Sequence, residues 1–199
     1  MDSVLNSRID ALCEDGRRFW FEFDSSHRQE HWHPFVPSDY DQARSVLLSL
    51  RRPGLRFLEW GSATGVITIM ADLMGFDACG IELDPDLASF ARRLAERFGS
   101  DARYATGSFI PLGWTWKPPD GDGRLATIGD GPSGYLDLKC SLDDFDIVYG
   151  YPWSGEEALM HDLMRCHGHR DALLLLHTVE HGIRAYRRGV EVQVQASLD

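Results

Sequence analysis

The stretch from Phe57 to Pro85 constrains the fold more than any other part of the sequence. It opens with an apolar run, turns through a loop that holds Gly61 and Gly65, and continues over residues 66–74 with apolar side chains at helical spacing. A second apolar run, residues 78–81, ends at Glu82, about twenty residues after the first glycine. This order of strand, glycine loop, helix and strand predicts an α/β fold.

The residue types in this unit indicate a nucleoside ligand that carries a positive charge. Gly61 and Gly65 let the backbone turn sharply and approach a ligand, and the following helix presents unpaired N–H groups at its start. Glu82 offers two acceptor oxygens to a ribose diol. Glu59, two residues before the first glycine, would repel a diphosphate and suits a cation instead.

Residues 59–65, EWGSATG, resemble the first motif of the class I S-adenosylmethionine (SAM)-dependent methyltransferases, an acidic residue, any residue and then G-x-G-x-G, with Ala63 at the middle glycine. The resemblance covers residues 34–180 and implies a Rossmann-like fold with SAM as cofactor. It implies that Glu59 accepts from the methionine ammonium, that the loop from Gly61 to Gly65 packs under SAM, and that Glu82 binds the ribose hydroxyls. A Rossmann-like unit for another nucleotide is the alternative.

The same resemblance places further cofactor contacts where the second and third strands end. In the family an acidic residue at the third exit often contacts the adenine amine; here Ser108 is closest to that position, and Phe109 is expected to form an apolar wall. The predicted cofactor-binding residues are Glu59, Gly61, Ser62, Ala63, Gly65, Glu82, Leu83, Ser108, Phe109 and Tyr149.

The acceptor pocket is predicted at the exit of the fourth strand, which together with its exit loop spans residues 145–153, because ligands bind at the carboxyl edge of open parallel sheets. Tyr149, Tyr151 and Trp153 are the candidates for its wall. The exit loop resembles the N-P-P-Y motif of family members that methylate nucleobases or glutamine, but it lacks the amide, which argues against those substrates. Alternatively, Tyr151 and Trp153 only pack against the next helix.

We expect a single domain, residues 1–199, with a mostly parallel sheet in the order 3-2-1-4-5 plus an edge strand, and helices on both faces in three layers. Residues 1–52 are predicted to form a helical cap, with a first helix followed by an aromatic cluster. The aperiodic residues 112–144 are predicted to be an insertion or lid with a hairpin of residues 124–128 against 135–138. Ser154 and Glu157 predict a capping box.

The end of the chain predicts fewer strands than the family usually has. Residues 171–177 contain a run of four leucines typical of a buried parallel strand, and residues 190–195 alternate like an edge strand. Because the chain stops there, we expect one edge strand of the usual seven to be missing.

Composition narrows the classes of partner. A content of 43% hydrophobic and 26% charged residues is ordinary for a globular protein. No apolar run approaches the ~18 residues of a membrane helix, and no secretory signal is visible, so we expect a cytoplasmic protein without membrane contact. The formal net charge of -11 makes a nucleic-acid partner unfavourable.

No metal site is expected. His27, His31 and His33 lie close together in the sequence without an acid or cysteine that completes tetrahedral spacing. Cys166, His167 and His169 stand where a helix is predicted to end. The four cysteines form no C-x-x-C pair, so reduced thiols are expected.

The short segments 35–37, 80–85 and 149–152 look most like those of small single-domain protein-lysine methyltransferases. The resemblance therefore implies methyl transfer from SAM to an unidentified acceptor, most simply an amine on a protein lysine or a small molecule. A degenerate SAM-binding or scaffold protein without catalysis is the alternative. The intact set of Glu59, Gly61, Gly65 and Glu82 favours an enzyme.

Overall fold

The computed structural model describes residues 3–27, 36–114, 131–153 and 155–194. The strands are β1 (Arg56–Trp60), β2 (Asp77–Glu82), β3 (Arg103–Thr106), β4 (Ile147–Gly150), β5 (Leu173–Thr178), β6 (Gly182–Arg187) and β7 (Val190–Val192). The helices are α1 (Ser3–His27), α2 (Tyr40–Leu50), α3 (Val66–Leu73), α4 (Pro85–Arg97), α5 (Gly134–Leu138), the 3-10 turn η2 (Leu142–Asp144) and α6 (Glu156–His167).

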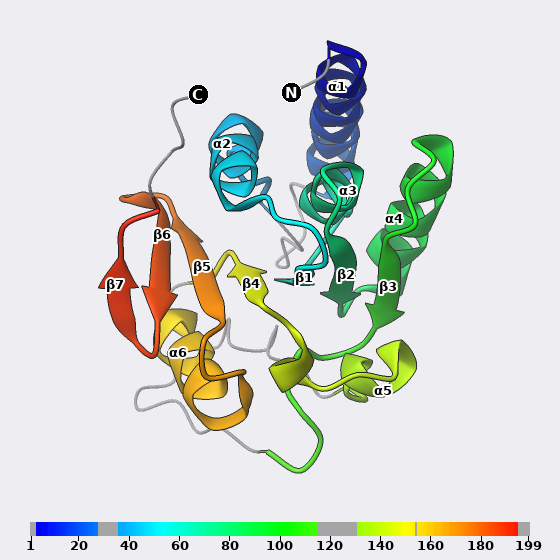
Figure 1. The fold of residues 1–199 in the computed structure, drawn as a ribbon. Coiled ribbons are helices and arrows are strands. Elements are labelled where there is room, and N and C mark those ends of the chain that lie inside the picture. Colours follow the sequence, from blue (N-terminus) through cyan, green and yellow to red (C-terminus); the bar gives the residue numbers. More distant parts are fainter. Residues whose placement is uncertain (1–2, 28–35, 115–130, 154, 195–199) are drawn as a thin grey trace.

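These strands form one sheet in the order β3-β2-β1-β4-β5-β6-β7. Strands β1 to β5 run parallel to one another. Strand β6 pairs antiparallel to β5, and β7 pairs antiparallel to β6. Helices α1 to α4 cover one face and α5 and α6 the other, so three layers result (Figure 1). The predicted Rossmann-like order 3-2-1-4-5 is confirmed.

Alternation along the central strands builds a separate apolar core on each face of the sheet. Phe57 of β1 packs among the side chains of α1, α2 and α3, whereas its neighbours Leu58 and Trp60 pack toward α5, η2 and α6. Because successive side chains of a strand point to opposite faces, an almost continuous apolar sequence is what a strand buried on both faces requires.

Two aspartates cap helices next to the sheet. Asp39 accepts from the N–H groups of Asp41 and Gln42 at 3.1 and 3.0 Å and so caps the start of α2. Asp84 accepts in the same way at the start of α4 at 2.8 and 3.1 Å. The Asp84 cap lets α4 begin directly after β2 ends at Glu82, whereas the Asp39 cap starts the helix that precedes β1.

The capping box predicted for Ser154 and Glu157 is wrong in its N-cap, and Ser154 itself lies outside the described residues. Helix α6 begins at Glu156, with Gly155 as N-cap at φ +92°. The carboxylate of Glu156 reaches back and accepts from the Trp153 N–H at 2.9 Å. A glycine takes the left-handed conformation readily, so the turn does not need a side-chain cap at that position.

The aromatic cluster predicted to follow the first helix lies within it. Helix α1 runs without interruption to His27, and Phe19 contacts the ring of Phe90 on α4. Gly16 lets α1 approach α3 closely, because a Cβ there would lie 2.6 Å from Val66 Cγ2. The predicted cap therefore forms part of the helical layer over the sheet.

The predicted hairpin in residues 112–144 is also wrong in its second strand. Residues 135–138 belong to α5, which contacts β2 and β3. Tyr135 and Leu138 are buried at helical spacing, while Leu136 between them is 58% exposed. The sequence alone does not show this, because periodicity cannot separate helix from strand in so short an apolar segment. The other half, residues 124–128, lies outside the described residues.

The expectation of a missing edge strand is wrong as well. Residues 182–187 form β6 after a tight turn in which Gly182 has φ +66°, and β7 pairs beside it. Gln42 of α2 accepts from the Ile183 N–H at 2.8 Å, which joins the helical layer to this hairpin. The alternation of Ile183 and Ala185 was the available signal for β6.

Candidate functional site

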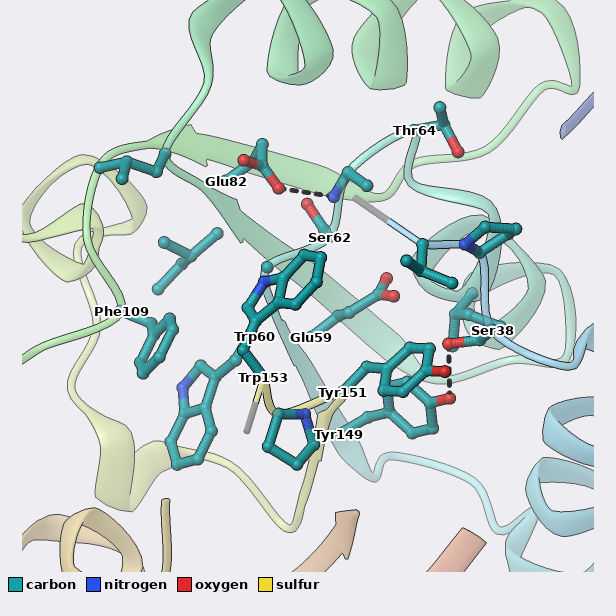
Figure 2. A pocket seen from close by; sticks show the side chains of 18 of the residues that line it. Ser38, Glu59, Trp60, Ser62, Thr64, Glu82, Phe109, Tyr149, Tyr151 and Trp153 are labelled. Carbon is teal, nitrogen blue, oxygen red and sulfur yellow. Dashed lines mark hydrogen bonds between the residues drawn. The ribbon is translucent and has the colours of Figure 1, made fainter. Parts of the chain in front are cut away.

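A pocket of about 450 Å³ opens where β1, β2 and β4 end. Beyond β1 the sheet continues toward β2 on one side and β4 on the other, so this is the topological switch point at which open α/β sheets bind ligands. Figure 2 shows its carboxylate and aromatic side chains around one hollow. Eleven of the twelve predicted site residues line it: Glu59, Gly61, Ser62, Ala63, Glu82, Leu83, Ser108, Phe109, Tyr149, Tyr151 and Trp153.

Gly65 is the predicted residue that is not among the residues lining the pocket. It has φ +77°, and a Cβ would lie 2.5 Å from Tyr104 Oη and 2.8 Å from Ala91 Cβ. The Tyr104 hydroxyl donates to the Gly65 carbonyl at 3.0 Å. Gly65 therefore lets the loop pack against β3 and α4 rather than exposing backbone to the pocket.

The loop after β1 is held by backbone hydrogen bonds. Gly61 and Ser62 both donate their N–H groups to the Ile81 carbonyl, at 2.9 and 3.0 Å. Ala63 has φ +44°, a left-handed conformation that glycine adopts more easily. This conformation explains why the middle position of the motif is usually glycine.

Glu59 lies on the face of β1 that points toward α3, and only 5% of it is exposed. Its Oε2 accepts from the Thr68 N–H at 2.9 Å and from the Thr68 hydroxyl. Burial raises the pKa of Glu59 to about 8; the Thr68 hydrogen bonds oppose this rise, and the nearby charge of Glu82 adds to it. A bound cation would favour the ionised form.

Glu82 joins the glycine loop to the exit of β2. Its Oε2 accepts from the Ala63 N–H at 2.7 Å and its Oε1 from the Asp84 N–H at 2.9 Å. Burial raises its pKa, against the effect of these two backbone donors. Each carboxylate oxygen can accept a second hydrogen bond, so the orientation fixed by the loop leaves capacity for a ligand hydroxyl.

An aromatic pair forms the opposite wall, made of the predicted Phe109 and of Trp60, which was not predicted as a site residue. Trp60 stacks on Phe109, with ring centroids 5.3 Å apart and an interplanar angle of 22°. The Trp60 Nε1–H donates to Tyr135 Oη at 2.8 Å, so α5 fixes the ring. Ser108 uses its hydroxyl oxygen within its own turn, accepting from the Ile110 N–H at 3.1 Å. Phe109 lines the pocket, and its role as an apolar wall for the cofactor stays a prediction.

The predicted acceptor wall divides into a buried and a more open part. Tyr149 is 2% exposed, and its hydroxyl contacts Ser38 Oγ at 2.9 Å and His177 Nδ1 at 3.2 Å. Tyr151 is half-buried and stacks on the His177 ring at 4.7 Å, and Trp153 is half-buried beside Glu156. Burial raises the pKa of both tyrosines above the ordinary range.

The lining has a one-sided charge. Among the described residues, its ionisable acidic members are Glu59, Glu82, Asp84 and Glu156, and it contains no arginine, lysine or histidine. Ser38, Tyr40, Thr64, Glu156 and Met160 also line it, and sequence reasoning did not assign them to the site. Thr64 lies within the glycine loop of residues 59–65. The other four come from segments that only tertiary packing brings together, so no local motif marks them.

Within the described ranges 3–27, 36–114, 131–153 and 155–194, no three histidine, cysteine or acidic side chains are grouped as metal ligands. Cys13, Cys79, Cys140 and Cys166 are free thiols. His31 and His33 lie outside the described residues, so the absence of a metal stays a prediction. Across the same ranges, every helix is too short or too polar to span a bilayer.

No protein-family model matches the chain. It is 32% identical over 85 residues to a ribosomal protein L11 methyltransferase of Thermus thermophilus, a match that covers 40% of this chain and about a third (34%) of that protein. An RNA methyltransferase from Salinibacter ruber, solved with S-adenosyl-L-homocysteine, has a TM-score of 0.52 at 15% identity and matches over 83% of this chain and 98% of its own. The chain therefore has the Rossmann-like fold of the class I SAM-dependent methyltransferases.

Proposed function

We propose that this chain binds SAM in the pocket and transfers its methyl group to an amine. One observation carries the proposal: two buried carboxylates, Glu59 and Glu82, lie near the carboxyl ends of the adjacent strands β1 and β2 and line one pocket. SAM needs such a pair, because its ammonium and its ribose diol are separated by the sulfonium and both require acceptors. The acidic lining also suits the sulfonium.

The proposed orientation follows from the order of the strands. Glu82 accepts from the ribose hydroxyls, the ammonium lies against Glu59, and the adenine ring lies between Leu83 and the stacked pair of Trp60 and Phe109. A flat aromatic wall suits a purine, since stacking does not require a side-chain partner for the adenine amine. Ser108, whose oxygen is engaged in its own turn, need not supply one.

The methyl acceptor would enter beside Tyr151 and Trp153, at the exit of β4. A neutral amine attacks the methyl carbon in line with the breaking bond to sulfur; sulfur keeps the bonding pair, and the new ammonium loses its extra proton to water. Alignment in a site shielded by aromatic rings supplies much of the rate without a dedicated base. The carboxylates in the lining favour an amine over a phosphate-bearing acceptor.

The test is transfer of label from methyl-labelled SAM to three acceptors offered separately: a lysine-rich protein, a set of small polyamines and total RNA. The proposal predicts label on one of the amine acceptors. Label on RNA alone would contradict the amine assignment. SAM binding without transfer to any acceptor would favour the degenerate scaffold, and absence of SAM binding would contradict the proposal as a whole.

A further inference from the structure

Three polar side chains form a hydrogen-bonded row that ends in the pocket. Ser38 precedes α2, Tyr149 lies on β4 and His177 lies on β5, and the two contacts between them measure 2.9 and 3.2 Å. Figure 2 shows the Ser38 and Tyr149 oxygens meeting beside Glu59. Tyr149 is also paired in register with Glu59 across β1 and β4. The row therefore lies at the end of the pocket that holds Glu59.

The geometry assigns a donor and an acceptor to each hydrogen bond in the row. Tyr149 has one hydroxyl proton, and it donates this proton to Ser38 Oγ. The contact with His177 then requires the Nδ1–H of His177 to donate to Tyr149 Oη. Tyr151 stacks on the imidazole at 4.7 Å and holds its plane. In this arrangement the Ser38 hydroxyl proton is directed neither to Tyr149 nor to His177, so it can be donated to a ligand.

His177 is a suitable root for such a row. Only 6% of it is exposed, and burial lowers its pKa, while the negative charge of Asp39 acts in the opposite direction. Burial raises the pKa of the neighbouring Tyr149 and Tyr151 hydroxyls, so both stay protonated at neutral pH. A neutral imidazole with the proton on Nδ1 satisfies the row without placing a charge inside the core.

A carboxylate in this pocket would find hydroxyl donors but no basic side chain among the described lining residues. Four amides of the glycine loop are also committed within the protein, namely those of Gly61, Ser62, Ala63 and Gly65. The Thr68 N–H is taken by Glu59. A hydroxyl donor beside Glu59 therefore complements a ligand whose ammonium and carboxylate are attached to the same carbon.

We propose, on the basis of the proposed function, that the row of Ser38, Tyr149 and His177 recognises the carboxylate of the amino-acid end of SAM. Ser38 contacts the carboxylate directly. Tyr149 and His177 are positioning residues that keep the Ser38 hydroxyl in its donor direction. Glu59 and this row together would read the two charges of an α-amino acid.

The experiment compares SAM with decarboxylated SAM, which retains the sulfonium and the ammonium, by calorimetry. Ser38→Ala should weaken SAM binding about ten- to hundredfold, because it removes a hydrogen bond to a charged group. Tyr149→Phe and His177→Phe, which retain the aromatic rings, should weaken it about three- to tenfold. Affinity for decarboxylated SAM should stay within about twofold in every variant. Tyr186→Phe, on β6 and outside the lining, is the matched control.

A second measurement distinguishes the assigned direction of the hydrogen bonds from a role of these side chains in packing alone. The ¹⁵N spectrum of His177 should show a protonated Nδ1, and His177→Asn, which supplies an N–H, should restore part of the affinity lost in His177→Phe. An Nε2–H tautomer would overturn the assigned direction. An equal loss of affinity for SAM and for decarboxylated SAM in the variants would show that the row has only a structural role. If the wild-type protein binds neither SAM nor decarboxylated SAM, the proposed function is contradicted, and the tautomer of His177 does not change that result.

Discussion

Replacing Glu59 by glutamine should stabilise the protein and weaken its cofactor binding at the same time. The carboxyl is buried and its pKa is raised from 4.5 to about 8. The folded state therefore holds this proton more tightly than the unfolded chain does. The resulting stabilisation is fully present below pH 4.5 and is lost as the pH rises toward 8. Glutamine stays neutral throughout and keeps a carbonyl oxygen for Thr68.

The magnitude follows from the shift. Each pH unit between 4.5 and 8 removes about 1.4 kcal/mol from the wild-type protein, so at pH 7 Glu59→Gln should be more stable by roughly 3 kcal/mol. The two proteins should have similar stability near pH 4.5. SAM affinity of the variant should fall about ten- to hundredfold, because the ammonium loses a charged partner.

Urea unfolding of both proteins at pH 5, 7 and 8, followed by calorimetry with SAM, checks both parts of this prediction. Glu157→Gln, an exposed glutamate on α6, is the matched control and should change stability by less than about 0.5 kcal/mol at each pH. A stability difference for Glu59→Gln that does not grow with pH would refute the account of Glu59 as a buried, neutral acid. Unchanged SAM affinity would refute its role as the ammonium partner.

Three further predictions concern the loop, the acceptor wall and metals. Gly80→Ala should cost about 1 to 3 kcal/mol of stability and weaken SAM binding, because the added Cβ would lie 2.7 Å from both Cβ and Oγ of Ser62. Urea unfolding measures the loss of stability and calorimetry the loss of SAM affinity. An unchanged SAM affinity would contradict the prediction. Tyr151→Ala and Trp153→Ala should lower turnover while SAM affinity stays within about threefold, since both residues lie beyond the end of β4. Turnover equal to that of the wild type in folded variants would show that both rings serve only in packing. Elemental analysis should find no stoichiometric zinc or iron, and a chelator that abolishes activity would show this to be wrong.

The local parts of the fold could be predicted because they depend on short stretches of sequence. The unit from β1 to β2, with its glycine loop and both carboxylates, is encoded within thirty residues, and the capping aspartates Asp39 and Asp84 lie next to the helices they start. The resemblance to the class I methyltransferases implied the cofactor residues, and the rule that ligands bind at the carboxyl edge of a parallel sheet indicated the candidates at the exit of β4.

The parts that could not be predicted depend on distant contacts. Trp60 is fixed by Tyr135, 75 positions away, and Tyr149 by Ser38, 111 positions away, so no local pattern reveals either pair. Residues 135–138 are too short and apolar for periodicity to separate helix from strand, and packing on β2 and β3 decides for α5. His177 belongs to residues 171–177, whose sequence predicts a buried strand and does not mark the histidine as a site residue.

The measurement that tests the central claim most directly is calorimetric titration of SAM into the wild-type protein, Glu82→Gln and Glu82→Ala. The account predicts one site in the wild type and an affinity about ten- to hundredfold lower in both variants, because a charge-assisted hydrogen bond to the ribose is lost. Glu82→Gln can still accept from Ala63, which controls for collapse of the loop. No binding to the folded wild type, or equal affinity in the folded variants, would contradict it.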